Sequence, residues 1–308
     1  MAKKVKIIIV GIGGVGGYFG GLLANKYVGK GAVEIVFVAR GEHLSAIKTN
    51  GLKVLKGDET FIANPDLATD RFDEAGLADY IIICTKSYGL NQTLDSLKPC
   101  IAPHTVLLPL LNGVDAYDII NRRFPENTLL KGCAFIISRL KSAGVIENSG
   151  AIQKISFGLD GALTPEVLLL NQICRDAGIE VNCTDKISTA VWEKFIFISP
   201  TATATSFYNK TIGEVLLHHS HELKLLIAEI KSLALAKGIS LGDDITERTF
   251  NTMKSMKYEA TSSMHRDYLA QKPETEVESL TGYIVREAAK WGIETPAYTH
   301  FYAGLVVR

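Results

Sequence analysis

A glycine-rich turn after the first apolar run constrains the fold of this chain more than any other feature. The run Val5–Val10 leads directly into Gly11-Ile12-Gly13-Gly14-Val15-Gly16, which fits the pattern G-x-G-x-x-G, and the segment Gly20–Tyr27 then has helical character. In a strand–turn–helix unit such glycines allow a tight turn, close approach of a pyrophosphate to the backbone, and close packing of helix on strand. The N–H groups at the helix N-terminus also favour phosphate. We therefore predict that a dinucleotide is bound by Gly11, Gly13, Gly14, Val15 and Gly16; the alternative is a glycine-rich turn without a ligand.

The residues after the second predicted strand indicate which dinucleotide is bound. A fold that prefers NAD usually carries Asp or Glu at this strand end, where the carboxylate bonds the ribose 2′-hydroxyl. Here Ala39 and Arg40 take that place. A guanidinium can bind a 2′-phosphate through two parallel hydrogen bonds. Arg40 therefore favours NADP(H) as the cofactor, and the alternative is that Arg40 is an ordinary surface arginine.

Strand-like and helix-like segments alternate through the first half of the chain. The strand candidates are Val5–Val10, Val33–Ala39, Leu52–Leu55, Tyr80–Cys84, Thr105–Leu111, Cys133–Leu140 and Gly144–Ser156. Their mostly apolar character is typical of a parallel sheet covered by helices on both faces. After about residue 185 the apolar residues recur at helical spacing, in Val215–Lys237 with a break at His219-Ser220, and in Val277–Trp291. We predict an α/β fold, with a doubly wound parallel sheet in residues 1–185 and a helical domain in residues 186–308.

Composition excludes several classes of protein. The 33 basic and 33 acidic residues give no net charge, so no overall basic field attracts a nucleic acid. The uncharged stretch Ile7–Asn25 is long enough to span a membrane, but it contains seven of the 27 glycines and is a poor helix. The five cysteines form no CxxC pair, and in the cluster His218, His219 and His221 the two that would share a helical face, His218 and His221, have no third ligand of known position, so we predict no metal site. We expect a soluble, cytoplasmic protein.

Three further residues are candidates for the chemistry. Lys86 follows the apolar strand Tyr80–Cys84, and Asn112 follows the next apolar strand, which places both where open α/β sheets bind ligands. Lys194 opens the uncharged stretch Phe195–Asn209, where an apolar neighbourhood suits an ammonium to give up its proton. Each also has an ordinary explanation: exposed or snorkelling lysines, and an Asn-Gly turn.

Together these residues resemble the ketopantoate reductases (2-dehydropantoate 2-reductases) over nearly the whole chain. The motifs that carry the resemblance are Gly11–Gly16, Arg40-Gly41 with Leu44, Thr85-Lys86, Asn112-Gly113, Trp192-x-Lys194, Ser262-Ser263-Met264 with Asp267, Thr275-Glu276, Gly282, and Gly292-Ile293 with Pro296. The resemblance implies an N-terminal Rossmann-type domain, a C-terminal all-helical domain, and an active site between them. It leaves open whether the protein is a monomer or a homodimer.

The implied activity is NADPH-dependent reduction of the small-molecule 2-keto acid 2-dehydropantoate to D-pantoate, a step of pantothenate (vitamin B5) and coenzyme A biosynthesis. In the family, the lysine matching Lys194 is the general acid and the glutamate matching Glu276 supports it. The residues matching Lys86 and Asn112 lie where cofactor and substrate meet. The serine matching Ser263 helps to hold the substrate.

The chain departs from the family pattern at three positions. The family usually has asparagines, which bind the substrate's hydroxyl and carboxylate, where this sequence has Ile198, Ala202 and Ile212. Serines and threonines between Ser199 and Thr205, and Asn209, lie nearby and could take over. A site built to bond a substrate hydroxyl discriminates strongly, so the change leaves open a paralogue that reduces another small 2-keto acid. A non-catalytic NADPH-binding sensor is the remaining alternative.

Overall fold

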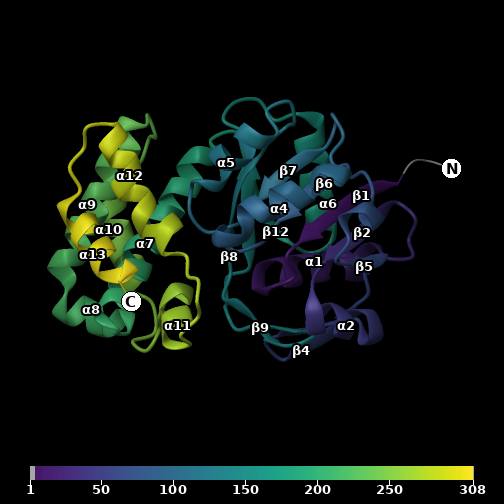
Figure 1. Cartoon of the computed structure of the whole chain (residues 1–308), viewed down its shortest axis with the longest axis horizontal. Coiled ribbons are helices and arrows are strands. Elements are labelled where there is room, and N and C mark those ends of the chain that lie inside the picture. Colours follow the sequence, from purple (N-terminus) through teal and green to yellow (C-terminus); the bar gives the residue numbers. More distant parts are fainter. Residues whose placement is uncertain (1–3, 308) are drawn as a thin grey trace. The chain divides into compact units, whose positions relative to one another are not determined.

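The computed structural model describes residues 4–307, and the chain divides into two compact units. Residues 1–111 and 116–187 form unit 1, and residues 112–115 and 188–308 form unit 2. Every strand in the described part of the chain belongs to unit 1, whereas unit 2 is built from helices (Figure 1). The predicted fold class, a parallel α/β sheet followed by a helical region, is confirmed.

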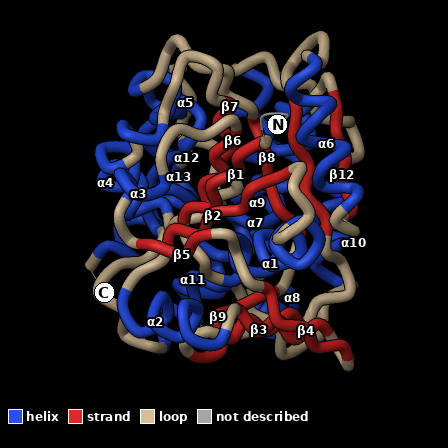
Figure 2. Tube along the Cα trace, turned by 90° about the vertical axis from the view of Figure 1, so that its right-hand side faces the viewer, coloured by secondary structure: helices blue, strands red, loops and turns tan. Residues whose placement is uncertain are grey.

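Unit 1 is organised around a five-stranded sheet in which every neighbouring pair is parallel. The strands are β1 (Val5–Val10), β2 (Val33–Val38), β5 (Leu67–Thr69), β6 (Tyr80–Ile83) and β7 (Val106–Pro109). Their order is β5-β2-β1-β6-β7, which can be followed across the unit in Figure 2. Since β1 is central and its neighbours lie on both sides of it, the residues after β1, β2 and β6 emerge at the same edge of the sheet.

The apolar runs of these strands are explained by burial on both faces. Along β1, Ile7 and Ile9 belong to one buried cluster, while Ile8 and Val10 belong to another. Successive side chains of a strand point to opposite faces, so the alternation shows a core on each side of the sheet. This is why the strands are apolar throughout rather than at every second position.

Unit 1 also contains two smaller sheets, and their strands differ from those predicted from the sequence. One contains β3 (Leu52–Lys56), β4 (Glu59–Ala63), β9 (Ser138–Ser142) and β10 (Val145–Asn148), and the other contains β8 (Lys131–Phe135), β11 (Lys154–Gly158) and β12 (Glu180–Thr184). Both mix parallel and antiparallel pairs. The predicted single strands Cys133–Leu140 and Gly144–Ser156 are therefore wrong, because each run contributes to both sheets and breaks where the chain changes partner.

Helices complete unit 1. They are α1 (Gly14–Tyr27), α2 (Gly41–Asn50), α3 (Phe72–Ala75), α4 (Leu90–Ser96), α5 (Ala116–Arg123) and α6 (Pro165–Asp176), with 3₁₀ turns η1 (Ser87–Gly89) and η2 (Lys98–Cys100). Helix α1 lies between two sheets, with Gly20 against Phe37 of β2 and Gly17 against Ile146 of β10. A side chain at Gly17 would overlap Ile146, and one at Gly20 would be in tight contact with Phe37, so the glycine content of α1 allows close packing on two sides.

Unit 2 consists of helices around a single buried cluster. They are α7 (Ile187–Tyr208), α8 (Ile212–His218), α9 (Ser220–Ala236), α10 (Ile245–Lys254), α11 (Ser263–Leu269), the π-helix η3 (Glu278–Gly282), α12 (Tyr283–Lys290) and α13 (Pro296–Val306). The predicted stripe Val215–Lys237 is two helices divided at His219, and the stripe Val277–Trp291 begins as a π-helix. Across residues 4–307, no helix has both the length and the apolar character needed to cross a bilayer.

Candidate active site

The glycine-rich turn of unit 1 has the close backbone contacts that its sequence predicts. Gly11 has a φ of +89°, and a Cβ added to it would lie 3.0 Å from the backbone of Cys84 and Thr85. A Cβ on Gly16 would lie 2.2 Å from the carbonyl oxygen of Gly11, and one on Gly14 would lie 2.3 Å from the carbonyl oxygen of Ser138. At these three positions the protein's own backbone leaves no room for a residue larger than glycine.

Gly13 differs from the other glycines of the turn. A Cβ added there would meet nothing within 4 Å, so the protein itself does not require glycine at this position. Gly13 is the N-cap of α1, no side chain caps the helix, and its first turn, which includes the half-buried Val15, carries no acidic residue. Open space in front of an uncapped helix N-terminus is what a pyrophosphate needs. The turn thus fits a dinucleotide.

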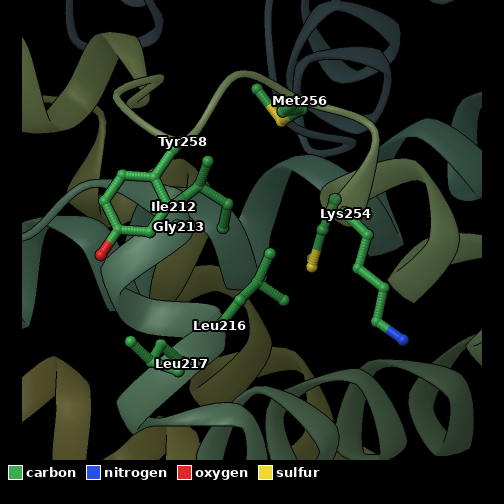
Figure 3. A pocket seen from close by; sticks show the side chains of 8 residues that line it. Ile212, Gly213, Leu216, Leu217, Lys254, Met256 and Tyr258 are labelled. Atoms are coloured by element: carbon green, nitrogen blue, oxygen red, sulfur yellow. The ribbon is translucent and has the colours of Figure 1, made fainter.

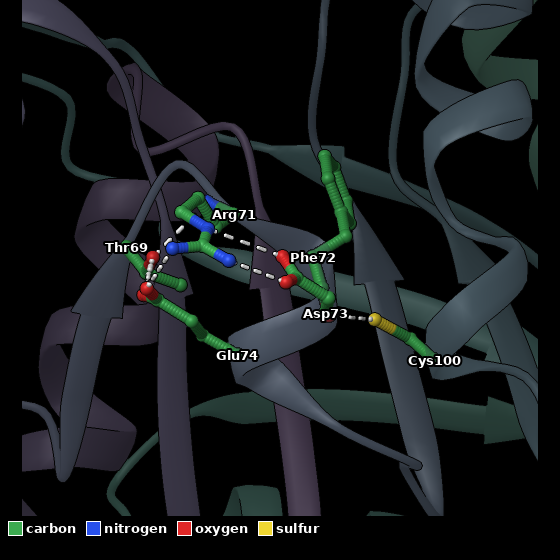
Figure 4. Close-up of polar contacts among 6 residues, drawn as sticks. All are labelled: Thr69, Arg71, Phe72, Asp73, Glu74 and Cys100. Carbon is green, nitrogen blue, oxygen red and sulfur yellow. Dashed lines mark hydrogen bonds and ion pairs between the residues drawn. The ribbon is translucent and has the colours of Figure 1, made fainter.

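Arg40 lies beyond the end of β2 and is the N-cap residue of α2. Its side chain is exposed and makes no ion pair with another residue of the range 4–307. The neighbouring strand β5 is followed by a second arginine, Arg71, which Figure 4 shows beside two carboxylates. Arg71 pairs with Asp73 at 2.6 Å and with Glu74 at 3.1 Å, and Glu74 also accepts from Thr69 at 2.6 Å. Of these two guanidinium groups, Arg40 is the one available to an added phosphate.

Lys86 lies just after β6, next to the glycine-rich turn. The backbone N of Thr85 is one of the atoms closest to Gly11, and Lys86 is the next residue. The Lys86 side chain is half-buried, and its backbone is extended before the turn η1. Cys84, which precedes this pair, is not a reactive thiol, because burial raises its pKa to about 12.

Lys194 and Asn112, which are 82 positions apart, meet in unit 2. The Nζ atom of Lys194 donates to Oδ1 of Asn112 at 3.1 Å. Lys194 is half-buried on α7, and the residues near it in sequence, Trp192 and Phe195, are buried and pack edge to face with their ring centroids 5.6 Å apart. An ammonium has three N–H donors, and this hydrogen bond uses one of them.

The segment around Glu276 adjoins the Asn112-Gly113 loop. A Cβ on Gly113 would lie 3.3 Å from the carbonyl oxygen of Ser279. Ser279 in turn donates from its hydroxyl to the carbonyl oxygen of Glu276 at 3.2 Å. Glu276 is only 1% exposed. The structure therefore brings Lys194 into contact with Asn112 and places the segment of the buried Glu276 against the next residue of that loop, Gly113.

Ser263 is the first residue of α11, and its side chain is half-buried. Its neighbour Ser262 caps this helix by accepting from the backbone N of His265 at 3.0 Å. The Ser262 hydroxyl also contacts Thr205 of α7 at 3.0 Å. Helix α7 therefore contacts the start of α11 through this hydrogen bond. The Ser263 hydroxyl makes no hydrogen bond to another residue between 4 and 307.

The three positions where the family usually has asparagines are apolar and packed. Ala202 and Ile212 are fully buried, and Ile198 packs against the core of unit 2. Nearby polar groups are already engaged within the protein: Ser199 with Leu280, and Asn209 with His265. The expectation that these groups take over from the asparagines therefore gains no support from the structure.

The sequence does not identify Ser279 and Tyr298 as residues that contribute to this region. Both are buried polar residues, on η3 and α13. Ser279 lies in the segment Val277–Trp291, whose spacing predicts only an apolar helical stripe. A polar residue on the buried side of such a stripe is the signal that would have identified it.

Other features of unit 2 do not belong to this group. A hollow of about 380 Å³ is lined by Ile212, Gly213, Leu216, Leu217, Met253, Lys254, Met256 and Tyr258 (Figure 3). None of the predicted catalytic residues lines it. His219 stacks on Tyr208 with a ring separation of 3.5 Å, while His218 and His221 are exposed. Residues 4–307 contain no group of three or more His, Cys, Asp or Glu side chains arranged to hold a metal ion.

Comparison with known families covers both units. Residues 7–161 match the family described as "Ketopantoate reductase PanE/ApbA", and residues 186–306 match "Ketopantoate reductase PanE/ApbA C terminal".

Individual relatives cover nearly the whole chain. The chain is 31% identical over 306 residues to an uncharacterized oxidoreductase, YkpB, of Bacillus subtilis, covering 98% of both proteins. It is 28% identical over 296 residues to 2-dehydropantoate 2-reductase of Halobacterium salinarum, covering 95% of both. Among solved structures, 2-dehydropantoate 2-reductase from Porphyromonas gingivalis is similar with a TM-score of 0.87 and 33% identity, over 99% of this chain and 100% of that one.

Proposed function

The chain belongs to the ketopantoate reductase family of nicotinamide-dinucleotide-dependent oxidoreductases, and from this premise we propose that it reduces 2-dehydropantoate to D-pantoate with NADPH. The product would supply pantothenate and coenzyme A biosynthesis. The observation that carries the proposal is the contact between Lys194 Nζ and Asn112 Oδ1 at 3.1 Å, beside the segment of the buried Glu276. It provides an oriented proton donor in a chain that also has a dinucleotide turn.

Residues of unit 1 would hold the cofactor. The backbone of Gly11–Gly16 and the N-terminus of α1 would bind the pyrophosphate, with Gly13 giving it room. Arg40, exposed at the end of β2, would bond a 2′-phosphate, which is why NADPH rather than NADH is proposed. Lys86 would contact the nicotinamide end or the substrate. Bound NADPH supplies the hydride for the 2-keto carbon.

Residues of unit 2 would donate the proton and bind the substrate. Hydride addition turns the keto oxygen into an oxyanion, and Lys194 would donate a proton from Nζ to that oxygen. General acid catalysis of this kind contributes about 10²–10⁴-fold. Asn112 would hold the Lys194 ammonium in place, and Glu276 would support it. Ser263, with Lys86 and Asn112, would bind the substrate.

The apolar residues near Lys194 favour a second candidate substrate. Ile198 lies one helical turn after Lys194, so the two share a face of α7. Ile198 is partly buried against apolar neighbours, and a substrate hydroxyl beside it would lose its hydrogen bonds to water without replacement. This favours a small 2-keto acid whose side chain is entirely apolar.

A substrate panel tests both candidates. NADPH oxidation would be followed by absorbance with ketopantoate and with 2-keto acids of similar size that lack the hydroxyl, using the parent protein and Lys194→Ala. Preference for ketopantoate supports the first candidate, and preference for apolar acids supports the second. Undiminished turnover by Lys194→Ala would overturn the proposed acid. Absence of turnover with every acid would instead favour an NADPH-binding sensor.

A further inference from the structure

The π-helix η3 is held by helix α7 through side chains that the catalytic proposal does not use. In a π-turn the N–H groups bond to carbonyls five residues back rather than four; such turns are rare, and many of those known lie at functional sites. Here the turn spans Glu278–Gly282, directly after the buried Glu276. The groups that stabilise this turn therefore bear on the position of Glu276.

Ser199 of α7 makes the first of these contacts. Its hydroxyl donates to the carbonyl oxygen of Leu280 at 2.5 Å, and its Oγ atom lies 2.7 Å from the hydroxyl of Tyr298. A serine hydroxyl has one proton, so Tyr298 is the donor in the second bond. Tyr298 is itself fixed, because its backbone N–H donates to Glu229 at 2.9 Å. Ser199, Leu280 and Tyr298 are all buried.

Thr203 makes a second contact one helical turn further along α7. Its Oγ1 atom lies 2.7 Å from Oγ1 of Thr281, and both side chains are fully buried. Residues four apart on a helix share a face, so one face of α7 holds two consecutive residues of the π-turn. Buried hydroxyl pairs cost free energy when one partner is removed, and so the contacts hold η3 in one position.

These contacts close a ring that includes the proposed acid. Lys194 on α7 binds Asn112, and Gly113 lies against Ser279 of η3. The next residue, Leu280, is bound by Ser199, five positions after Lys194 on the same helix. A displacement of η3 would therefore move both the loop that holds Lys194 and the segment that carries Glu276.

We propose that Ser199 and Tyr298 are positioning residues, which hold the π-turn so that Asn112 stays bonded to Lys194 and the segment that carries Glu276 keeps its place. This proposal rests on the proposed function for its kinetic consequence, but the structural part stands separately. A misplacement of about 1 Å in an active site can cost about a hundredfold in rate. The effect should appear in kcat, because the cofactor-binding residues of unit 1 are not part of the ring.

The test compares Ser199→Ala with Thr201→Val. Thr201 is a buried hydroxyl on the same helix, but its bond goes to the carbonyl oxygen of Phe197 within α7. With the best 2-keto acid, Ser199→Ala should lower kcat at least about tenfold with the KM for NADPH unchanged. Thr201→Val should retain the parent kcat. Tyr298→Phe keeps the aromatic ring and removes only the hydroxyl that donates to Ser199, so it should lower kcat less than Ser199→Ala does. It replaces Ser199→Ala in the test if the Ser199→Ala protein does not fold.

Hydrogen–deuterium exchange separates this proposal from the proposed function. In Ser199→Ala or Tyr298→Phe, amides of residues 276–283 should exchange faster than in the parent, and Thr201→Val should leave them unchanged. If the parent reduces no 2-keto acid, the proposed function fails, and the exchange result still decides the role of Ser199. Parent-like exchange at η3, or an equal loss of kcat in Thr201→Val, would overturn the positioning role.

Discussion

The dinucleotide turn of unit 1 and the lysine group of unit 2 are built in opposite ways. The turn comes from six consecutive residues, and its proposed function depends on missing side chains that let backbone approach backbone. The lysine group comes from segments around Asn112, Lys194 and Glu276, and it depends on side-chain hydrogen bonds, from Lys194 to Asn112 and from Ser279 to the backbone of Glu276. A ligand site made of backbone tolerates no added atoms, whereas one made of side chains tolerates no lost ones.

The largest expected effect tests the first half of that contrast. In Gly16→Ala the new methyl group would lie 2.2 Å from the carbonyl oxygen of Gly11, an overlap with backbone that cannot be relieved by rotating a side chain. Overpacking of this kind costs about 1–3 kcal/mol. We expect NADPH binding, measured by fluorescence titration, to disappear, and the free energy of unfolding in denaturant to fall.

Gly13→Ala is the matched variant, because its methyl group would meet no protein atom within 4 Å. Its free energy of unfolding should change by about 1 kcal/mol or less, the usual cost of alanine at an N-cap. NADPH binding should nevertheless weaken severalfold or more, since the methyl would occupy the space left for the pyrophosphate. Binding as tight as in the parent would contradict the assignment of the turn.

An intermediate effect is expected from removing one side chain of the lysine group. Asn112→Ala deletes the acceptor of the Lys194 ammonium, and a hydrogen bond to a charged group is worth about 1.5–3 kcal/mol. We expect kcat/KM for the 2-keto acid to fall by about ten- to a hundredfold. Asn121→Ala, on the exposed surface of α5, is the control and should behave as the parent does. Equal kinetics in the two variants would remove Asn112 from the proposed mechanism.

The smallest expected effect concerns cofactor choice, where a side chain adds selectivity to a backbone site. Arg40→Ala should raise the KM for NADPH about tenfold, the equivalent of about 1.4 kcal/mol, and leave the KM for NADH unchanged. Arg71→Ala is the control, because Arg71 already pairs with Asp73 and Glu74. Similar NADPH kinetics in Arg40→Ala and the parent would show that the 2′-phosphate is bound elsewhere.

The same contrast explains how much could be predicted from the sequence. The glycine turn, the central parallel strands and the helical character of unit 2 follow from local patterns, because a turn or a helix is decided by residues near one another. The runs Cys133–Leu140 and Gly144–Ser156 were misread because a change of partner sheet leaves little trace in hydrophobicity. Local patterns indicate which residues are buried, but they do not indicate which strand or helix those residues pack against.

The lysine group shows the same limit. Lys194, Asn112 and Glu276 could each be singled out, but the contact between Lys194 and Asn112 depends on the path of the chain between them. Ser199 was noted only as a nearby polar residue, and its bond to a π-turn could not be expected, because the segment Val277–Trp291 has the spacing of an ordinary helix. The periodicity of apolar residues therefore cannot reveal a residue whose role depends on an irregular helical turn.

The glycines that let α1 fit between two sheets also bear on how the cofactor site assembles. Five glycines in a helix of 14 residues, each costing about 1 kcal/mol relative to alanine at an interior position, make α1 a poor helix in isolation. Its helical state must come from docking onto β2 on one side and β10 on the other, strands that are more than 100 residues apart in the chain. We therefore expect the proposed phosphate-binding turn to form late in folding, once residues up to at least Asn148 have been synthesised and packed, so that a nascent or truncated chain would have the complete motif without the ability to bind a nucleotide.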